Sequence, residues 1–394
     1  MNKYYFTHGR GLYEFAKNEL DILALSLKNE SNFSYKVDVC DYIEGKLLFE
    51  TNLDLKNLLK LTTIERLFFS IIFKKFDNCE ISSKTILDNI TESLDLNPSD
   101  KRFMFVLDNY NEKKDEILEN NSKKFRNVIK YRIDCKLTGK WRSNSDLKTK
   151  IIDCITNNLS QHNFEVDLSS PNFVISCHLS EIALVLGIPV TNLPLSFRNT
   201  IKNIGLRSTI CSAMIQLSEI LENYDNILIL DPFCGKSTIL CEMMHQYKDR
   251  KNIFYLCSDC DSKQIDFSVD NCNAIKNSEN LISDFICSNL FKNSKFPFKD
   301  DIFDLIITDL PFGKNHPVKF FQNQQDFYVT ILSEFNRLVN KSKGFCVLLV
   351  NSKEMSILEH TLSQKENEWF LISKYLVSLG ETSAYLTKIS RSKS

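Results

Sequence analysis

At residues 227–238 the chain reads Ile-Leu-Ile-Leu-Asp-Pro-Phe-Cys-Gly-Lys-Ser-Thr. Four apolar residues are typical of a strand buried on both faces, and a helical pattern follows the turn. In a doubly wound sheet, ligands bind outside the carboxyl end of a central strand, at the N-terminus of the next helix. We expect Asp231 to meet the positive end of a nucleoside cofactor, and Gly235 to let the backbone approach it. A strand, a turn and a helix with one glycine are also common as plain architecture, so both interpretations stay open.

Strand and helix patterns alternate regularly around this stretch. Apolar strands are predicted at 253–258, 304–308 and 344–350, with helices at 238–247 and 265–274. Continuous apolar strands indicate a mostly parallel sheet that is covered on both faces. The second half of the chain is therefore expected to be a doubly wound α/β domain.

An acidic cluster, Asp259-Cys260-Asp261, follows the next predicted strand. A carboxylate at that place accepts hydrogen bonds from ribose hydroxyls, and Asp259 is the first candidate, with Asp261 in reserve. A helix N-cap explains the same residues. Cys257 and Cys260 have zinc-ligand spacing, but no second cysteine pair accompanies them, so no metal site is predicted.

A third strand runs into the motif Thr308-Asp309-Leu310-Pro311-Phe312-Gly313. The amino group of a flat base is a poor nucleophile because its lone pair is delocalised into the ring. Hydrogen bonds to the Asp309 carboxylate and the Leu310 carbonyl would favour a pyramidal nitrogen, while Phe312 would stack on the flipped base. A plain turn at Pro311 is the structural alternative, which three such motifs on successive strands disfavour.

The first half has a different pattern. Residues 1–85 follow the order β-α-β-β-α-β, which is typical of a ferredoxin-like unit. Residues 86–122 are polar and weakly patterned, and we expect a helix, an edge strand and a connection there. Strands and one central helix between 125 and 189 predict a small α/β module.

The charge is distributed unevenly along the chain. Residues 123–150 hold ten basic and two acidic side chains, a local net charge of +8 in a chain whose formal charge is -1. A basic face of this kind is suited to phosphates, although charge runs are often plain solvated surface. Our candidates for contacts with RNA are Arg132, Lys136, Lys140 and Arg142 in this region, and Arg198 further along the chain.

Length and composition limit the protein class. With 394 residues, 43% of them hydrophobic and 25% charged, the chain is expected to fold into two or three compact domains. Its 13 cysteines are read as reduced thiols. The longest apolar runs are too short to span a bilayer, so no membrane partner is expected.

Four passages give the chain a resemblance to a known family. They are Gly9-Arg10-Gly11-Leu12 with Glu65-Arg66-Leu67-Phe68; Lys136-Leu137-Thr138-Gly139 with Val166-Asp167-Leu168 and Pro171; Leu195-Ser196 with Arg198, Gly205-Leu206-Arg207 and Ala213-Met214; and the motifs at Asp231 and Asp309. The chain resembles the THUMP-domain-containing RNA guanine-N2 methyltransferases. This implies a ferredoxin-like unit at 1–100, a THUMP domain at 101–192 and a Rossmann-like class I methyltransferase domain at 193–394.

The resemblance also implies roles for single residues. Asp231, Phe233 and Gly235 would form part of the S-adenosylmethionine loop, with Asp259 as the ribose acceptor. The catalytic turn would be formed by Asp309, Leu310, Pro311 and Phe312.

Two positions depart from the family pattern. Ser237 stands where the family usually has a second glycine, which would lower cofactor affinity if the position needs a positive φ. Asn289 stands where an aspartate often contacts the adenine amine, and its amide oxygen could still accept that bond.

The resemblance implies U6 small nuclear RNA as substrate and the nucleus as location. Transfer RNA is the alternative substrate, with the cytoplasm as the alternative location. A catalytically weak RNA-binding protein is a third interpretation, motivated by Ser237 and Asn289. The family also implies a small zinc-binding methyltransferase-activator subunit that adds a strand to the catalytic sheet. The candidate surfaces for it are Ile253 to Cys257 and the loop after Asp261.

Overall fold

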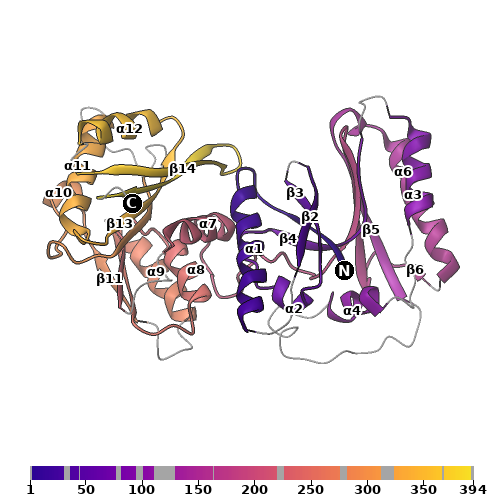
Figure 1. The fold of residues 1–394 in the computed structure, drawn as a ribbon, viewed down its shortest axis with the longest axis horizontal. Coiled ribbons are helices and arrows are strands. Elements are labelled where there is room, and N and C mark those ends of the chain that lie inside the picture. Colours follow the sequence, from indigo (N-terminus) through magenta and orange to yellow (C-terminus); the bar gives the residue numbers. More distant parts are fainter. Residues whose placement is uncertain are drawn as a thin grey trace. The chain divides into compact units, whose positions relative to one another are not determined.

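The computed structural model describes residues 2–30, 36–43, 45–76, 81–94, 101–110, 129–162, 164–219, 226–275, 282–311, 324–365 and 368–391. The chain forms two compact units (Figure 1). The first consists of Met1–His8 and Ala16–Phe197, and the second of Gly9–Phe15 and Arg198–Ser394. The short segment Gly9–Phe15 therefore belongs to the second unit, although it lies near the start of the chain.

The first unit begins with the ferredoxin-like order that the sequence predicts. Its elements are β1 (Asn2–Thr7), α1 (Tyr13–Glu30), β2 (Val37–Ile43), β3 (Lys46–Thr51), α2 (Leu55–Leu58) and β4 (Arg66–Lys75). These strands are antiparallel neighbours in the order β2-β3-β1-β4. This is the strand order of a split β-α-β unit.

The same sheet continues into the remainder of the first unit. The elements there are α3 (Ser83–Ser93), α4 (Lys101–Tyr110), β5 (Ile129–Leu137), a 3₁₀ turn (Gly139–Trp141), α6 (Ser145–Leu159), a second 3₁₀ turn (Ser160–His162), β6 (Phe164–Val166), β7 (Phe173–Leu179) and β8 (Ala183–Pro189). Because β4 pairs with β8, one eight-stranded sheet results, in the order β2-β3-β1-β4-β8-β7-β5-β6.

The described residues within 86–122 form helices, while 95–100 and 111–122 lie outside the described residues, so the expected edge strand stays a prediction. The helices are parts of α3 and α4. In α4, Phe103, Val106, Leu107 and Tyr110 are all buried, and their spacing follows the helical period. The sequence predicts one helix in this segment, whereas the described residues belong to two.

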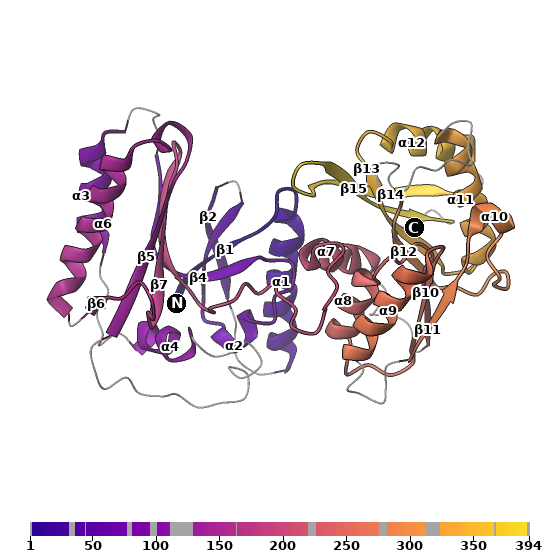
Figure 2. The ribbon, with the colours of Figure 1, turned by 180° about the vertical axis from the view of Figure 1, so that it is seen from behind.

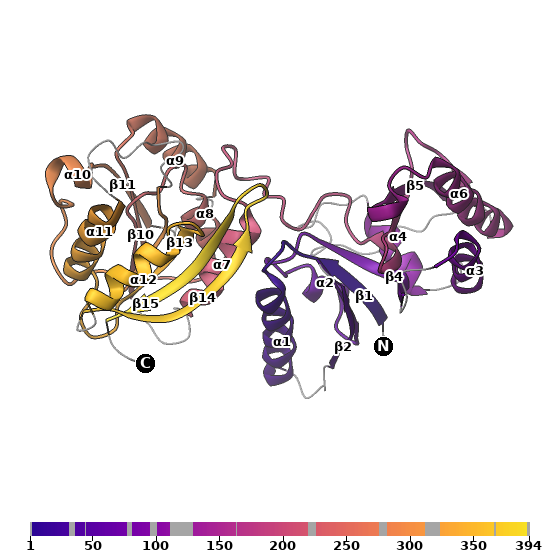
Figure 3. The same cartoon turned by 90° about the horizontal axis from the view of Figure 1, so that it is seen from above.

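The second unit is a sheet with helices on both faces (Figures 2 and 3). Its elements are α7 (Ser208–Ser218), β9 (Ile227–Asp231), α8 (Thr238–Gln246), β10 (Ile253–Asp259), α9 (Ser262–Ile275), β11 (Ile282–Cys287), α10 (Leu290–Asn293), β12 (Leu305–Asp309), α11 (Gln324–Leu338), β13 (Phe345–Asn351), α12 (Met355–Gln364), β14 (Phe370–Ser378) and β15 (Ser383–Ser390). The strand order is β11-β10-β9-β12-β13-β15-β14. Strands β9 to β13 are parallel, while β15 runs antiparallel to both of its neighbours. The Rossmann-like methyltransferase fold that the sequence predicts is confirmed.

Successive residues of the central strands bury their side chains in two different cores. Ile229 and Ile307 pack in the core that contains α7, α8 and α9, whereas Leu230 and Ile306 pack in the core that contains α11 and α12. The alternation follows from the period of two residues in a strand. It explains why these strands are apolar throughout.

Among the described residues, no helix is both long enough and apolar enough to cross a membrane.

Candidate active site

Three carboxylates stand at the carboxyl ends of three neighbouring strands in the second unit. Asp259 ends β10, Asp231 ends β9 and Asp309 ends β12, and these strands adjoin in the order β10-β9-β12. The chain proceeds from β9 to β10 and β11 on one side, then crosses to β12 on the other. Asp231 and Asp309 therefore flank the point where the strand order reverses, which is where doubly wound sheets bind ligands.

Asp231 is almost fully buried. Its Oδ1 accepts a hydrogen bond of 2.6 Å from the Thr308 hydroxyl and one of 3.2 Å from the Phe233 backbone N–H. Burial raises the pKa of Asp231 to about 8; the two hydrogen bonds oppose this rise, and the negative charge of Asp309 adds to it. Burial disfavours the ionised form of this carboxylate, and a cationic ligand beside it would stabilise that form. Sequence reasoning missed Thr308, although a polar residue in an apolar strand was a visible signal.

Asp309 has a different environment. Its Oδ1 is buried and has no hydrogen-bond partner within the described part of the chain. Burial raises the pKa of Asp309 to about 7. An unsatisfied buried acceptor costs about 1–3 kcal/mol, so native proteins keep such groups mainly where they function. Asp309 Oδ1 is therefore suited to accept a hydrogen bond from a ligand.

The turn after β9 is held by Asp259. The Gly235 N–H donates to Asp259 Oδ2 at 2.9 Å, and the Asp261 N–H donates to Oδ1 at 2.9 Å. Gly235 has a φ of +51°, and a Cβ at this position would meet only Gln264 Oε1, at 3.9 Å, among the described atoms. The backbone at Gly235 is thus open on the side where a side chain would project. Each oxygen of Asp259 also keeps a free lone pair for a ribose hydroxyl.

Ser237 occupies a backbone conformation that favours glycine. Its φ is +55°, so the position does need the left-handed region. The side chain is fully buried and its hydroxyl hydrogen-bonds to the Ser268 hydroxyl. A residue with a side chain is strained at this φ, and the hydrogen bond offsets part of that strain.

Asn289 uses its amide oxygen within the protein. Oδ1 accepts hydrogen bonds of 3.0 Å from the N–H groups of Phe291 and Lys292, as the N-cap of α10. The oxygen that we expected to accept a bond from an adenine amine is therefore already engaged. The Nδ2 group of Asn289 is a donor only and cannot replace that acceptor.

The other residues predicted for this site differ in their surroundings. Leu310 is buried, and its N–H donates to the Leu349 carbonyl at 3.1 Å. Phe233 is half-buried and stacks on Phe291, with ring centroids 6.3 Å apart. Pro311 is half-buried, and Phe312 lies outside the described residues.

The predicted RNA contacts lie in the first unit, with one exception. Lys136, Lys140 and Arg142 are exposed at the end of β5 and in the turn that follows it. Arg132 donates two hydrogen bonds to Asp134, at 3.1 and 3.3 Å, so a neighbouring carboxylate partly compensates its charge.

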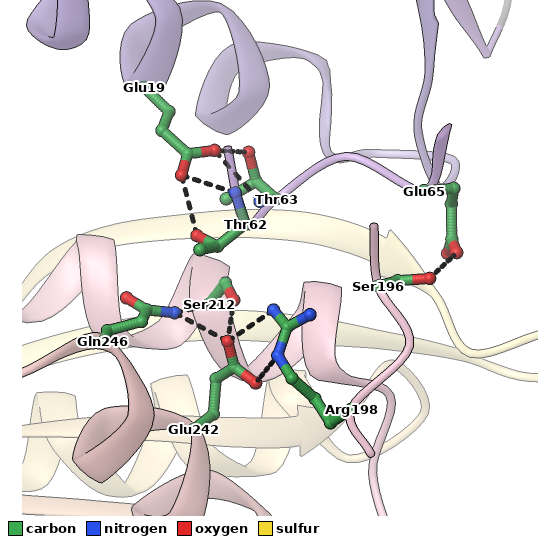
Figure 4. Close-up of polar contacts among 9 residues, drawn as sticks. All are labelled: Glu19, Thr62, Thr63, Glu65, Ser196, Arg198, Ser212, Glu242 and Gln246. Atoms are coloured by element: carbon green, nitrogen blue, oxygen red, sulfur yellow. Dashed lines mark hydrogen bonds and ion pairs between the residues drawn. The ribbon is translucent and has the colours of Figure 1, made fainter. Parts of the chain in front are cut away.

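Arg198 is the exception, because it is buried in the second unit. Its guanidinium donates to Glu242 Oε2 at 2.9 Å and to Oε1 at 2.8 Å, and Ser212 and Gln246 also donate to Oε1 (Figure 4). Both charges of the pair are shielded from water. The RNA-binding role that we predicted for Arg198 is inconsistent with this burial, and we do not retain it.

Two hydrogen bonds within the first unit join passages that carry the family resemblance. The Ser196 hydroxyl donates to Glu65 Oε2 at 2.7 Å, and the Leu195 N–H donates to the Glu65 carbonyl at 2.9 Å (Figure 4). Nearby, Glu19 accepts four hydrogen bonds from the N–H and hydroxyl groups of Thr62 and Thr63. The motif residues Glu65, Leu195 and Ser196 thus hold the unit together.

Comparison with known proteins agrees with this architecture. Residues 196–378 match the family model UPF0020, described as an RMKL-like methyltransferase domain. TrmN from Thermus thermophilus is 16% identical, with a TM-score of 0.68 and 100% of each chain covered. A possible methylase from Clostridium difficile 630 is 15% identical, with a TM-score of 0.67 and coverage of 100% of this chain and 99% of that one. These structures share the fold.

Curated relatives are more similar in sequence. The Mus musculus protein named U6 snRNA (guanine-N(2))-methyltransferase THUMPD2 is 32% identical over 225 residues, which cover 56% of this chain and 39% of the relative. The Homo sapiens protein of the same name is 34% identical over 190 residues, with 48% and 34% covered. The human tRNA (guanine(6)-N(2))-methyltransferase THUMP3 is 26% identical over 272 residues, with 61% and 48% covered. The matched segments span less than half the length of these relatives, and they confirm the resemblance to the THUMP-containing family.

Proposed function

We propose that this chain, whose residues 196–378 form a methyltransferase domain of the UPF0020 family, is an S-adenosylmethionine-dependent RNA methyltransferase that forms N2-methylguanosine. The observation that carries the proposal is the pair Asp231 and Asp309. Asp231 is buried and Asp309 is half-buried with its Oδ1 shielded from water, both carboxylates flank the switch point of the sheet, and Asp309 Oδ1 lacks a donor among the described residues. A guanine amine supplies such a donor.

The residues present fit the cofactor. Asp231 offers a buried acceptor for a positive group, Asp259 keeps free lone pairs, and the turn at Gly235 leaves its backbone open. When bound, S-adenosylmethionine supplies an electrophilic methyl group on a sulfonium.

The chain's own task is to activate and aim the amine. The Asp309 carboxylate accepts a hydrogen bond from the guanine N2 amine, which draws the nitrogen out of conjugation with the ring. The same oxygen would take the proton that this nitrogen loses as its bond to the methyl carbon forms and the bond from that carbon to sulfur breaks. A pKa of about 7 suits Asp309 to accept that proton at neutral pH.

U6 small nuclear RNA is the substrate that we favour. The relatives named for it are 32% and 34% identical to this chain, whereas the human relative named for transfer RNA is 26% identical. A nuclear location follows from that substrate, and transfer RNA with a cytoplasmic location is the second candidate.

A transfer assay tests the activity and separates the substrates. The protein is incubated with labelled S-adenosylmethionine and either a U6 transcript or unfractionated transfer RNA, and nucleosides are identified by mass spectrometry. We expect N2-methylguanosine in the U6 transcript. Cofactor binding without transfer to either RNA would favour the catalytically weak RNA-binding protein.

The activator subunit is the second proposed partner, and the structure corrects the surface that we expected it to use. Strand β10, which contains Ile253 to Cys257, pairs with β9 and with β11, so it cannot accept another strand. The edge beside it is β11, where Ile282 is 49% exposed. An exposed edge strand is a template for pairing with another chain, so we now propose β11 as the site of strand addition.

Co-expression tests that assignment. Ile282→Lys should prevent recovery of a one-to-one complex with the activator, whereas Leu371→Lys, a similarly exposed position on β14 at the opposite edge, should not. Equal loss from both variants would contradict the choice of β11.

A further inference from the structure

A polar cluster in the first unit joins strands that lie far apart in its sheet. Lys46 Nζ lies 3.0 Å from His178 Nδ1. Lys46 begins β3 and His178 is near the end of β7, and three strands separate β3 from β7 in the sheet order. Sequence reasoning did not single out either residue.

Hydrogen bonds hold the Lys46 ammonium in one place. The ammonium donates to His178 Nδ1, so Nε2 carries the proton of the ring and donates to the Thr138 hydroxyl at 3.2 Å. Thr138 in turn lies within 3.2 Å of the Leu179 carbonyl. A lysine side chain, which is ordinarily flexible, is thereby aimed by a chain of partners that carry no negative charge.

A second cation stands beside this chain of hydrogen bonds. Lys136 on β5 is in register with His178 on β7 and is exposed. Burial, together with the charge of Lys136, lowers the pKa of Lys46. Burial and the charges of Lys46 and Lys136 lower the pKa of His178 to about 4, so the ring is neutral.

No carboxylate in the described ranges forms an ion pair with Lys46 or Lys136. Elsewhere in the same sheet, basic residues do have such partners: Lys3 pairs with Glu50 at 3.1 Å, and Lys130 with Asp167 at 3.0 Å. Two adjacent cations without an anion repel each other and disfavour the ligand-free fold. That cost is recovered when an anion binds between them.

We propose that Lys46 and Lys136 bind one backbone phosphate of the RNA, with His178 and Thr138 as positioning residues. The proposal rests on RNA being the substrate, as stated above. The RNA contacts that the sequence predicts in the first unit begin at β5. The proposal adds a contact from β3, in the ferredoxin-like part. Two elements distant in the sequence would then grip the same strand of RNA.

Salt-dependent binding of the full chain tests the proposal. Affinity for a labelled U6 transcript and for unfractionated transfer RNA is measured over a range of salt concentrations. Lys46→Met should weaken binding about tenfold at low salt, because it removes a charge-assisted hydrogen bond. It should also reduce the slope of log affinity against log salt by about 0.7–0.9, the value for one lost phosphate contact. Lys46→Arg should keep the slope.

Lys3→Met is the matched control, because it removes the same charge from the same sheet at a lysine that a carboxylate already neutralises. It should leave the slope unchanged, and an equal loss there would overturn the proposal. His178→Phe should weaken binding, whereas His178→Gln should restore it, since an amide oxygen can accept from Lys46.

Two further outcomes are distinguishable. If the unmodified chain binds RNA and Lys46→Met has no effect on slope or affinity, the phosphate site is wrong and the proposed function stands. If the unmodified chain binds neither RNA, both are overturned.

Discussion

In the proposed reaction, one side chain, Asp309, contacts the amine and does not hold the cofactor. Its Oδ1 is buried without a donor in the described part of the chain, whereas Asp231 already has two. Asp309→Ala should therefore lower transfer by about 10²–10³-fold or more, the usual effect of losing one well-aimed group, while S-adenosylmethionine still binds. Calorimetry and a transfer assay measure the two effects separately. Full transfer by Asp309→Ala would refute its catalytic role.

If Asp231 meets the positive group of the cofactor as proposed, cofactor binding should depend on pH. The pKa of Asp231 is about 8 in the free protein against an ordinary 3.8, so most molecules carry the proton at pH 7. A cationic ligand favours the charged carboxylate and lowers that pKa, so binding releases a proton. Affinity should rise with pH until about pH 8 and then level off.

Calorimetry in buffers of different ionisation enthalpy measures this proton directly. Asp309→Ala should still release it, and Asp231→Asn should not. Binding at pH 7 without proton release would show that Asp231 does not meet the positive group.

The same raised pKa has the opposite consequence for stability. A group whose folded-state pKa lies above its unfolded value binds more protons when folded. The contribution of Asp231 to the free energy of unfolding therefore falls as the pH rises from about 4 towards 8. Above that pH the contribution stays at its lowest value. Ligand-free protein should be less stable at pH 9 than at pH 6 on this account, and cofactor should narrow the difference.

Asn289 offers a change that should improve the protein. Its Oδ1 caps α10, so only the Nδ2 group, which is a donor, is left for a ligand. Asn289→Asp keeps one oxygen for the cap and supplies a second acceptor, and a carboxylate also interacts more favourably with a helix N-terminus. We expect S-adenosylmethionine to bind several-fold more tightly, in the range of about 1 kcal/mol or a little more. Unchanged or weaker affinity would show that the adenine amine lies elsewhere.

At the scale of elements, the sequence predicts those whose pattern is local. The strands at Ile227, Ile253 and Leu305 were predicted because both of their faces are buried, which leaves a continuous apolar run. In the segment 86–122 the sequence predicts one helix, whereas the structure has α3 and α4, although the buried residues of α4 have regular helical spacing.

Long-range pairing explains the predictions that failed. Arg198 looks like any other basic residue, because its partner Glu242 lies 44 residues further along the chain. Similarly, the pairing that buries β10 depends on where β11 lies. Which strands form the edges of a sheet is a property of topology, and one sequence alone does not show it.

The Arg198–Glu242 pair joins the segment before α7 to helix α8. Arg198→Ala should destabilise the protein by about 3–5 kcal/mol, because it leaves the Glu242 carboxylate buried without its counter-ion. Arg198→Met combined with Glu242→Gln should recover much of this loss, since no unpaired charge remains. RNA affinity at a temperature where the variants stay folded should be unchanged. A selective loss of RNA affinity without a change in the unfolding temperature would restore Arg198 as an RNA contact.

At the scale of the whole molecule, the chain enters the second unit twice. Residues Gly9–Phe15 belong to that unit, although β1 before them and most of α1 after them belong to the first. The first family passage, Gly9 to Leu12, lies in this segment. A methyltransferase domain cut out as residues 198–394 would therefore lack part of its own core.

Leu12 and Phe15 carry the contribution of this segment to the stability of the second unit. Leu12 is fully buried in the core of the second unit, and the Phe15 ring contacts Tyr375 edge-on at 4.9 Å between centroids. Burying each side chain contributes about 1.5–3 kcal/mol to the free energy of unfolding of the second unit. In the fragment 198–394 that free energy should therefore be lower by about 3–6 kcal/mol than in the full chain. The position before Leu12 is equally constrained: Gly11 has a φ of +87°, and a Cβ there would lie 2.1 Å from the Leu376 carbonyl oxygen.

Three variants of the full chain turn this into a test. Leu12→Ala should lower the unfolding temperature of the second unit, and Gly11→Ala should lower it further, because backbone strain adds to a clash with backbone. Gly45→Ala is the matched control: its φ is also positive, at +80°, but it lies in the first unit and a Cβ there meets no atom closer than 3.7 Å. Cofactor binding, followed as a function of temperature, reports the second unit alone. If Gly11→Ala and Gly45→Ala lower the temperature at which cofactor binding is lost by the same amount, the segment Gly9–Phe15 is not part of the catalytic unit.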